Sequence, residues 1–289
     1  AEAWLSVISP TIMTAWRRAT LGGWLLIAAA SVTAHPFDPF AEEKKAEFQL
    51  VVEYLRQGET HEALLQADNA IAKFPKHGPF YTLRAQILLK RGLPQEALSA
   101  VEKAIALAPE YALSYWVRGL IHQHQNNPAD AIEDFNRVLK REDQNQLLLA
   151  QTIGSRGMAL TDVGRYQEAL EDLNRALELR ADAFAERQFR AIAYLALGRL
   201  DEAESDIAAL LTRDPNSSLL HRIQGELWLA RQDINRALTS LDRALALNPR
   251  DARGYRLRAL AHQALGQLKK FRADLAKACG LGEATACQP

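Results

Sequence analysis

Glycine, alanine and proline recur along this sequence at a fixed interval of 34 residues. The series are Gly58 and Gly92, Gly164 and Gly198, Pro75 and Pro109, Pro215 and Pro249, Ala63, Ala97 and Ala131, and Ala169, Ala203 and Ala237. Three residue types that keep one period indicate an array of repeated supersecondary units. Such units bury their apolar faces against their neighbours, so a stack of repeats is expected in place of one globular core.

The spacing of these residues resembles the tetratricopeptide repeat pattern. That pattern has a large residue at position 4, a small one at 8, glycine near 15, alanines at 20 and 27, and proline at 32. Seven blocks of this sequence fit it: 44–77, 78–111, 112–145, 150–183, 184–217, 218–251 and 252–285. The resemblance implies an all-α fold, a right-handed superhelical solenoid of seven helix-turn-helix repeats, followed by a C-terminal tail at residues 286–289.

Each recurrent residue type has a physical role in such a repeat. Small residues at positions 8, 20 and 27 allow two helices to approach closely. Glycine near position 15 lets the chain leave the first helix through a left-handed backbone conformation, and proline at position 32 ends the second helix. The seventh block has Phe271 in place of the alanine at position 20, a departure expected of a terminal repeat that caps the stack.

Four extra residues interrupt the register once. The third block ends at Asn145 and the fourth begins at Ala150, so residues 146–149 intervene. Four residues amount to about one helical turn, which predicts a one-turn extension of a helix at this junction. The insertion is either neutral, or it changes the local curvature and exposes an apolar edge at Leu147, Leu148 and Leu149.

Arginine recurs at position 7 and aspartate at position 23. The pairs are Arg118 with Asp134, Arg156 with Asp172, Arg190 with Asp206, and Arg258 with Asp274. In the sixth block Gln224 and Ser240 replace both residues together, and only Arg84, followed by Ala100, breaks the rule. This joint change favours structural ion pairs between the two helices of a repeat over a stripe of arginines for an anionic ligand.

The resemblance also assigns a protein-binding groove. In the family, positions near 2, 5, 9, 12 and 13 of each first helix line a concave surface. The corresponding residues here are Gln86, Trp116, Leu120, Gln123, Met158, Gln188, Ile192, Arg222, Glu226 and Arg256. Trp116 is either an anchor for a partner, since tryptophan is a common hot-spot residue, or a side chain that packs between helices. The family's Lys and Asn set for a terminal carboxylate is not found, so a helix or an extended peptide is the expected occupant.

Motifs of enzymes are missing from the sequence. It has no G-x-S-x-G elbow, phosphate-binding loop, dinucleotide fingerprint or H-E-x-x-H helix, and His122 and His124 would lie on different faces of a helix. We therefore expect no catalysis, no cofactor and no metal. The 35 basic and 35 acidic residues leave no cationic excess for general nucleic-acid binding.

The N-terminal 34 residues have the pattern of a secretory signal peptide. Arg17 and Arg18 precede an uncharged run that has small residues at its last and third-last positions, Ala34 and Val32. A helix that spans a membrane needs about 20 apolar residues, and this run is shorter. We therefore expect cleavage before His35, and an uncleaved membrane anchor is the alternative. A conventional signal peptide would begin at Met13, so residues 1–12 are expected to be an upstream extension. Residues 35–43 are expected to form a linker. The ordinary secretion route is favoured over the twin-arginine route.

Both cysteines stand near the end of the sequence. Cys279 and Cys287 resemble the paired cysteines at the ends of Sel1-like repeats in secreted bacterial proteins, and the resemblance implies a disulfide that staples the C-terminal end. An exported compartment permits such a bond.

These features together predict a non-catalytic scaffold of the cell envelope that binds a protein or peptide. It would be periplasmic in a bacterium with two membranes, and would contact a membrane only if the N-terminal segment is retained. The alternative is a membrane-anchored assembly factor or an accessory subunit of an envelope enzyme complex. Fold-level analogy carries much of this functional prediction.

Overall fold

The computed structural model describes residues 41–141 and 146–287. In these ranges the chain forms fourteen α-helices and one short 3-10 helix, without a β-strand. This confirms the predicted all-α class. The predicted signal peptide (residues 1–34, with the extension 1–12) and residues 35–40 of the expected linker lie outside the described residues.

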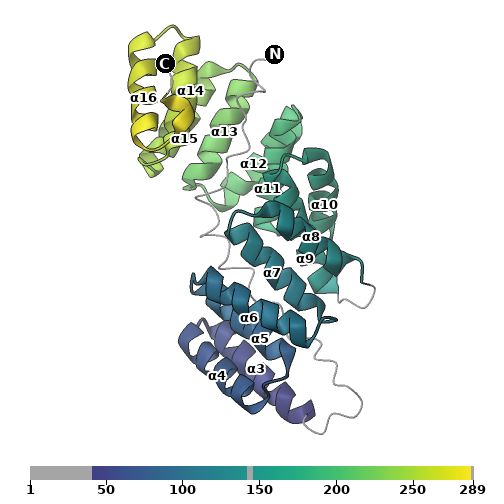
Figure 1. Cartoon of the computed structure of the whole chain (residues 1–289). Helices are drawn as coiled ribbons and strands as arrows, with labels where there is room; N and C mark the ends of the chain where they lie inside the picture. Colours follow the sequence, from purple (N-terminus) through teal and green to yellow (C-terminus); the bar gives the residue numbers. More distant parts are fainter. Residues whose placement is uncertain (1–40, 142–145, 288–289) are drawn as a thin grey trace. The chain divides into compact units, whose positions relative to one another are not determined.

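The helices form seven successive pairs, one for each predicted repeat (Figure 1). The pairs are α3 (Ala41–Gln57) with α4 (Thr60–Lys73), α5 (Gly78–Lys90) with α6 (Pro94–Leu107), α7 (Ala112–His124) with α8 (Pro128–Leu139), α9 (Gln146–Asp162) with α10 (Tyr166–Leu179), α11 (Phe184–Ala196) with α12 (Leu200–Arg213), α13 (Ser218–Ala230) with α14 (Ile234–Leu247), and α15 (Ala252–Ala264) with α16 (Leu268–Gly280), followed by the 3-10 helix η1 (Ala284–Ala286). The described residues fall into two compact units, 41–181 with α3–α10 and 182–287 with α11–α16.

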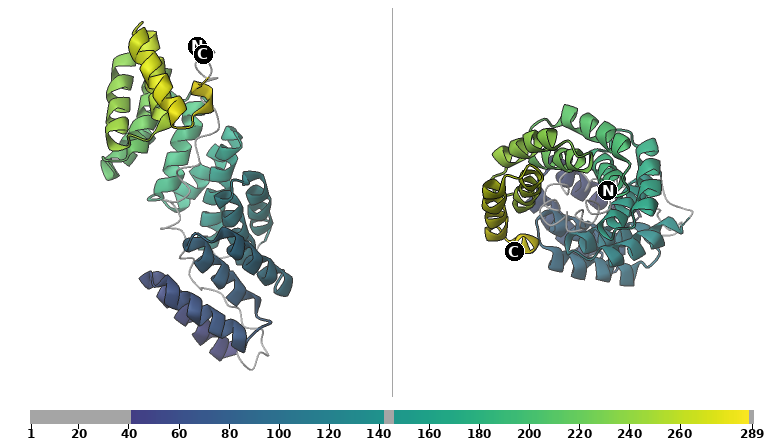
Figure 2. Two further views of the ribbon diagram at one scale, coloured as in Figure 1. Left: turned by 60° about the vertical axis from the view of Figure 1, so that its left-hand side comes forward. Right: turned by 90° about the horizontal axis from the view of Figure 1, so that it is seen from above.

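Each pair packs against the next within its unit. In residues 41–181, α4 contacts α5, α6 contacts α7 and α8 contacts α9, and in residues 182–287 α12 contacts α13 and α14 contacts α15 (Figure 2). The alanines at position 20 belong to the core: Ala63, Ala97, Ala131, Ala169, Ala203 and Ala237 are all fully buried. The core therefore runs from pair to pair along each unit.

The turn inside each repeat uses the left-handed conformation that the sequence predicted at position 15. Gly92, for example, has φ 76°. Where the repeat lacks glycine, Asn126 and Gln232 take its place with φ 68° and 61°. Asparagine is tolerated in this region, but glutamine is strained by roughly 1 kcal/mol. The helix-turn-helix geometry thus overrides the preference of the residue.

Glycine at position 8 marks the closest approach of the two helices. A Cβ built on Gly119 of α7 would lie 2.5 Å from ring atom Cε1 of Phe135 on α8, and one on Gly225 of α13 would lie 2.6 Å from Cγ of Leu241 on α14. Both opposing side chains are fully buried. They have no free space to move into, so a larger residue at position 8 forces the helices apart.

The four extra residues form the first turn of α9. This helix begins at Gln146 and has 17 residues, whereas α7 and α11 have 13 each. The insertion therefore lengthens one helix, as the sequence predicted. Within it Leu148 is buried, while Leu147 is 40% exposed. At the other end of this unit α3 already begins at Ala41, so it includes the last three residues of the expected linker.

We predict that Gly119→Ala destabilises the fold although alanine is the better helix former. The contact with Phe135 costs about 1–3 kcal/mol, more than the gain of about 1 kcal/mol in helix propensity. Gly280→Ala is the matched control, because nothing lies within 4 Å of a Cβ at that helical position. Urea unfolding followed by circular dichroism measures both. A Gly119→Ala protein as stable as the parent contradicts the close approach.

Candidate functional site

The first helices of neighbouring repeats contact one another on one side of each unit. In residues 41–181 α5 contacts both α3 and α7, and α7 contacts α9; in residues 182–287 α11 contacts α13, and α13 contacts α15. We call the surface of these first helices the first-helix face. All ten residues of the predicted groove belong to it.

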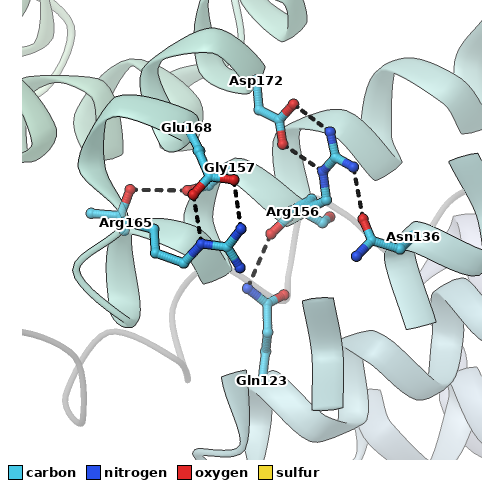
Figure 3. A network of polar contacts seen from close by, with 9 residues as sticks. Gln123, Asn136, Arg156, Gly157, Arg165, Glu168 and Asp172 are labelled. Atoms are coloured by element: carbon cyan, nitrogen blue, oxygen red, sulfur yellow. Dashed lines mark hydrogen bonds and ion pairs between the residues drawn. The ribbon is translucent and has the colours of Figure 1, made fainter. Parts of the chain in front are cut away.

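Four of the five groove residues in the first unit are buried. Gln86 on α5, Trp116 and Leu120 on α7, and Met158 on α9 are each less than a tenth exposed. The fifth, Gln123, is half-buried, and its Nε2 donates to the backbone carbonyl of Ser155, 3.3 Å away, so that it links α7 to α9 (Figure 3).

Several buried polar atoms on this face have no hydrogen-bond partner. They include Nε2 of Gln86 and the indole Nε1 of Trp116 among the predicted residues, and Oε1 of Gln151 and Oγ of Ser155, which sequence reasoning missed. All four side chains are more than nine-tenths buried. Since buried polar groups in folded proteins are nearly always paired, these atoms call for a further partner, which an ordered water or a bound ligand can supply.

The second unit repeats this arrangement on α11. Gln188 and Ile192 are both buried there, and Oε1 of Gln188 accepts no hydrogen bond. Gln188 stands at position 5 of its repeat, the same position as Trp116. The pattern of an unpaired polar atom on a buried side chain thus occurs in both units.

Charged residues replace the neutral ones on α13 and α15. Nε of Arg222 lies 3.0 Å from a carboxylate oxygen of Asp251, and Nε of Arg253 donates to Glu226 at 2.8 Å. Arg222 and Glu226 also lie 3.7 Å apart on α13. The predicted groove residues Arg222 and Glu226 are therefore engaged with each other and with their neighbours.

Arg256 completes this charged group. Its Nε lies 3.9 Å from Glu283. Burial lowers the pKa of Arg256, and the nearby positive charge of Arg253 lowers the pKa further. The guanidinium remains charged at any physiological pH, because arginine starts from a very high pKa. The unfavourable environment means that additional negative charge here is electrostatically favoured.

The arginines at position 7 meet the aspartates at position 23. In all four pairs Nε and Nη2 donate to the two carboxylate oxygens: the distances are 2.8 and 2.6 Å for Arg118–Asp134, 2.7 and 2.8 Å for Arg156–Asp172, 2.8 and 2.7 Å for Arg190–Asp206, and 2.8 and 2.8 Å for Arg258–Asp274. Each pair joins the first helix of a repeat to its second helix. The hydrogen bond with Asp134 raises the pKa of Arg118.

A second partner from the preceding repeat was not predicted. Nη1 of Arg156 donates to Asn136 of α8 at 2.7 Å (Figure 3), and Nη1 of Arg258 donates to Asp242 of α14 at 2.7 Å. Asn136 and Asp242 both stand at position 25 of their repeats. The 34-residue register contains this signal, because a polar residue recurs at position 25 of the repeat that precedes each of these arginines.

This second contact accounts for the exception at Arg84. Its position-23 partner would be Ala100, and its Nε instead donates to Asp68 of α4, at position 25 of the preceding repeat, 2.8 Å away. In the sixth repeat the Ser240 hydroxyl donates to Oε1 of Gln224 at 3.0 Å. A neutral hydrogen bond therefore occupies the place of the ion pair.

The structure pairs Cys279 with Cys287, whose Cα atoms are 4.8 Å apart. The pair joins the end of α16 to the residue after η1. In the described ranges 41–141 and 146–287, no group of three or more metal-binding side chains comes together, and no helix there combines the length and apolarity needed to cross a membrane.

Comparison with known families follows the same periodicity. One model of the tetratricopeptide repeat matches residues 48–112, 82–146 and 224–285, and a second matches residues 160–227, so most of the chain is covered. The chain belongs to the tetratricopeptide repeat family. Proteins of this family generally mediate protein–protein interaction, and their fold is typically a non-catalytic scaffold.

Curated relatives match parts of the repeat array. The chain is 27% identical over 162 residues to DnaJ homolog subfamily C member 3 of Bos taurus, which covers 51% of this chain and 31% of that protein. It is also 32% identical over 98 residues to the TPR repeat-containing thioredoxin TDX of Arabidopsis thaliana. This match covers 34% of this chain and 26% of that protein. The chain spans less than a third of the length of these relatives.

Solved structures share the fold at low identity. A tetratricopeptide repeat protein from Parabacteroides merdae has a TM-score of 0.59 at 19% identity, over 83% of this chain and 94% of that one. YrrB, described as having an unusual peptide-binding site, has a TM-score of 0.54 at 23% identity, over 68% of this chain and 97% of that one. PilW, a type IV pilus biogenesis factor, has a TM-score of 0.62 at 18% identity, over 72% of this chain and 94% of that one. These likenesses confirm the repeat fold.

We predict that Asp134→Ser lowers the free energy of unfolding by about 2 kcal/mol, because it leaves the half-buried guanidinium of Arg118 without its carboxylate. The double variant Arg118→Gln/Asp134→Ser should recover more than half of this loss, since the sixth repeat already holds a Gln–Ser pair at these positions. Urea unfolding of the three proteins tests this. A double variant less stable than Asp134→Ser argues against an isolated structural pair.

Proposed function

We propose that this protein is a non-catalytic scaffold of the cell envelope, which binds a helix or an extended peptide of a partner protein on its first-helix face. The unpaired, buried polar atoms of Gln86, Trp116 and Gln188 carry the proposal. A peptide backbone supplies both donors and acceptors, so it can pair with an amide nitrogen, an indole N–H and an amide oxygen.

The neighbouring side chains suit a segment of mixed character. Leu120, Met158 and Ile192 add apolar surface beside the polar atoms, and methionine adapts its shape to different partners. Arg222, Glu226 and Arg256 add charge at the C-terminal end of the array. Within each unit this supports recognition of a peptide along successive repeats, in which alternate side chains give specificity and the backbone gives affinity.

The comparisons support the same kind of function. Peptide binding appears in the description of YrrB, and PilW is described as a type IV pilus biogenesis factor. Export of the present chain rests on its own sequence, through the signal pattern of residues 1–34 and the Cys279–Cys287 pair. The secreted, oxidising compartment that the signal implies is one in which such a disulfide persists.

We predict that Gln86→Leu combined with Trp116→Phe weakens peptide binding about tenfold or more, because each change removes one hydrogen-bonding group worth about 1 kcal/mol, while leucine has nearly the size of glutamine and phenylalanine keeps an aromatic ring. Gln95→Leu is the matched control, since Gln95 is an exposed residue of α6 outside the first-helix face. The measurement is titration of peptides selected from a displayed library against the parent protein. Equal affinity for all three proteins would overturn the assignment of this face.

Expression in a bacterium with two membranes tests the envelope assignment. We predict a periplasmic protein whose N-terminus is His35 by sequencing, and whose intact mass rises by two hydrogen atoms on reduction because Cys279 and Cys287 are bonded. Cys287→Ser should remove the mass change. A protein that keeps residues 21–34 and fractionates with the inner membrane would favour the anchored alternative.

A further inference from the structure

The last helix of the array differs in charge from every other second helix. Among the second helices, the other six each expose at least one acidic residue: Glu62, Glu96, Asp130, Glu168, Asp201 and Asp242. On α16 the single acidic residue is Asp274, which is buried and bound to Arg258. The exposed surface of α16 therefore holds no negative charge.

Four cations and a leucine share this exposed surface. Lys269, Lys270, Arg272 and Lys277 are exposed, and the spacing of an α-helix puts them on one side, around the exposed small residues Ala273, Ala276 and Gly280. Leu268 lies at the edge of the same side and is 56% exposed, and Leu265 in the preceding turn is 43% exposed. We call Leu265, Leu268 and the four cations the α16 basic face.

The cations of this face have no partners within the described chain. None of the four side chains forms an ion pair or hydrogen bond with another described residue. Some exposed arginines elsewhere are engaged, as Arg165 is by Glu168 and Arg199 by Glu202. The basic side chains of α16 therefore contribute nothing visible to holding the repeats together.

Two of the cations are also placed against the helix dipole. Lys269 and Lys270 occupy the first turn of α16, which has no acidic residue and no side-chain cap. The first turns of α6, α8 and α10 contain Glu96, Asp130 and Glu168, the arrangement that the positive end of a helix favours. A locally unfavourable choice without a compensating contact points to a role outside the fold.

The charge extends beyond this one helix. Residues 218–287 contain twelve basic and six acidic side chains, whereas residues 146–217 contain eight and twelve. Residues 1–145 contain fifteen basic and seventeen acidic side chains, so the zero net charge of the whole chain is the sum of a slightly acidic beginning, an acidic middle and a basic end. A surface of negative charge would attract the last two repeats and repel the middle ones.

We propose that the α16 basic face binds the anionic headgroup surface of a lipid bilayer, and so holds the last repeat against a membrane while the first-helix face stays available. The observation that favours lipid is the combination of four unpaired cations along α16 with two exposed leucines, one at the start of this helix and one in the turn before it. Lipid headgroups attract the cations, and the boundary of the acyl chains accepts the leucines.

This route to a membrane differs from the one that the sequence predicted. That prediction relied on retention of the N-terminal segment, whereas the α16 basic face acts peripherally and depends on anionic lipid. Each Lys or Arg near an anionic surface contributes about 1 kcal/mol, so four of them strengthen binding by roughly a hundredfold or more. The effect weakens as salt screens the charges.

Co-sedimentation of the full chain with vesicles tests the proposal. One set of vesicles is phosphatidylcholine, and the other is equal parts phosphatidylcholine and phosphatidylglycerol. The test variant changes Lys269, Lys270, Arg272 and Lys277 to glutamine. The matched control changes four exposed basic residues of the first unit to glutamine: Lys76, Arg91, Lys140 and Arg175. Circular dichroism confirms that both variants keep their helices.

The parent and the control should bind the anionic vesicles roughly a hundredfold more tightly than the α16 variant does, and none should bind phosphatidylcholine alone. Leu265→Ala/Leu268→Ala should weaken binding by about tenfold. Equal binding by the α16 variant overturns the proposal. So does equal binding to both vesicles, the result expected of a retained N-terminal segment. Binding to polyglutamate without any vesicle binding would assign the face to an acidic protein instead.

Discussion

The close approach of the two helices in each repeat is the constraint on which the other features depend. Glycine or alanine at position 8 lets a first helix pack directly on a large side chain of its partner, as Gly119 does on Phe135. That approach fixes which neighbouring positions meet. Position 7 of the first helix then faces position 23 of the second, so that Arg118 can reach both oxygens of Asp134. The ion pair is a consequence of the packing, and its removal should cost stability without changing the fold.

Periodicity made the fold and these contacts predictable, within a limit set by what a period reports. A 34-residue register identifies positions that are equivalent, so the Arg–Asp pairs within a repeat could be found from joint replacement alone, as at Gln224 and Ser240. It does not say which repeat supplies a second partner. Arg84 with Asp68 and Arg156 with Asn136 reach back to the preceding repeat, a contact that depends on how adjacent pairs stack.

The first-helix face was assigned by analogy, and what the structure adds is the state of its polar atoms. Position alone could not separate Gln123, which pairs with a carbonyl of the next repeat, from Gln86, whose amide nitrogen is buried without a partner. Gln151 and Ser155 could not be predicted, because neither residue type nor its spacing indicates a binding role in the sequence. Hydrogen-bond satisfaction depends on a few tenths of an ångström and on angles, which a sequence pattern does not contain.

The net charge of the whole chain did not predict the basic surface of α16. It is a sum over all residues, whereas each part of the chain interacts with its own surroundings. Exposed charges more than about 10 Å apart are largely screened from each other in physiological salt, so an acidic segment elsewhere in the chain does not offset the lysines of α16 for a partner that approaches them. A repeat array makes this separation systematic, since each repeat contacts only its neighbours and can vary its exposed residues alone. The core positions are tied to the 34-residue period, while the outer face of each second helix is free to differ. For a protein of this kind, charge counted repeat by repeat is therefore more informative than the total.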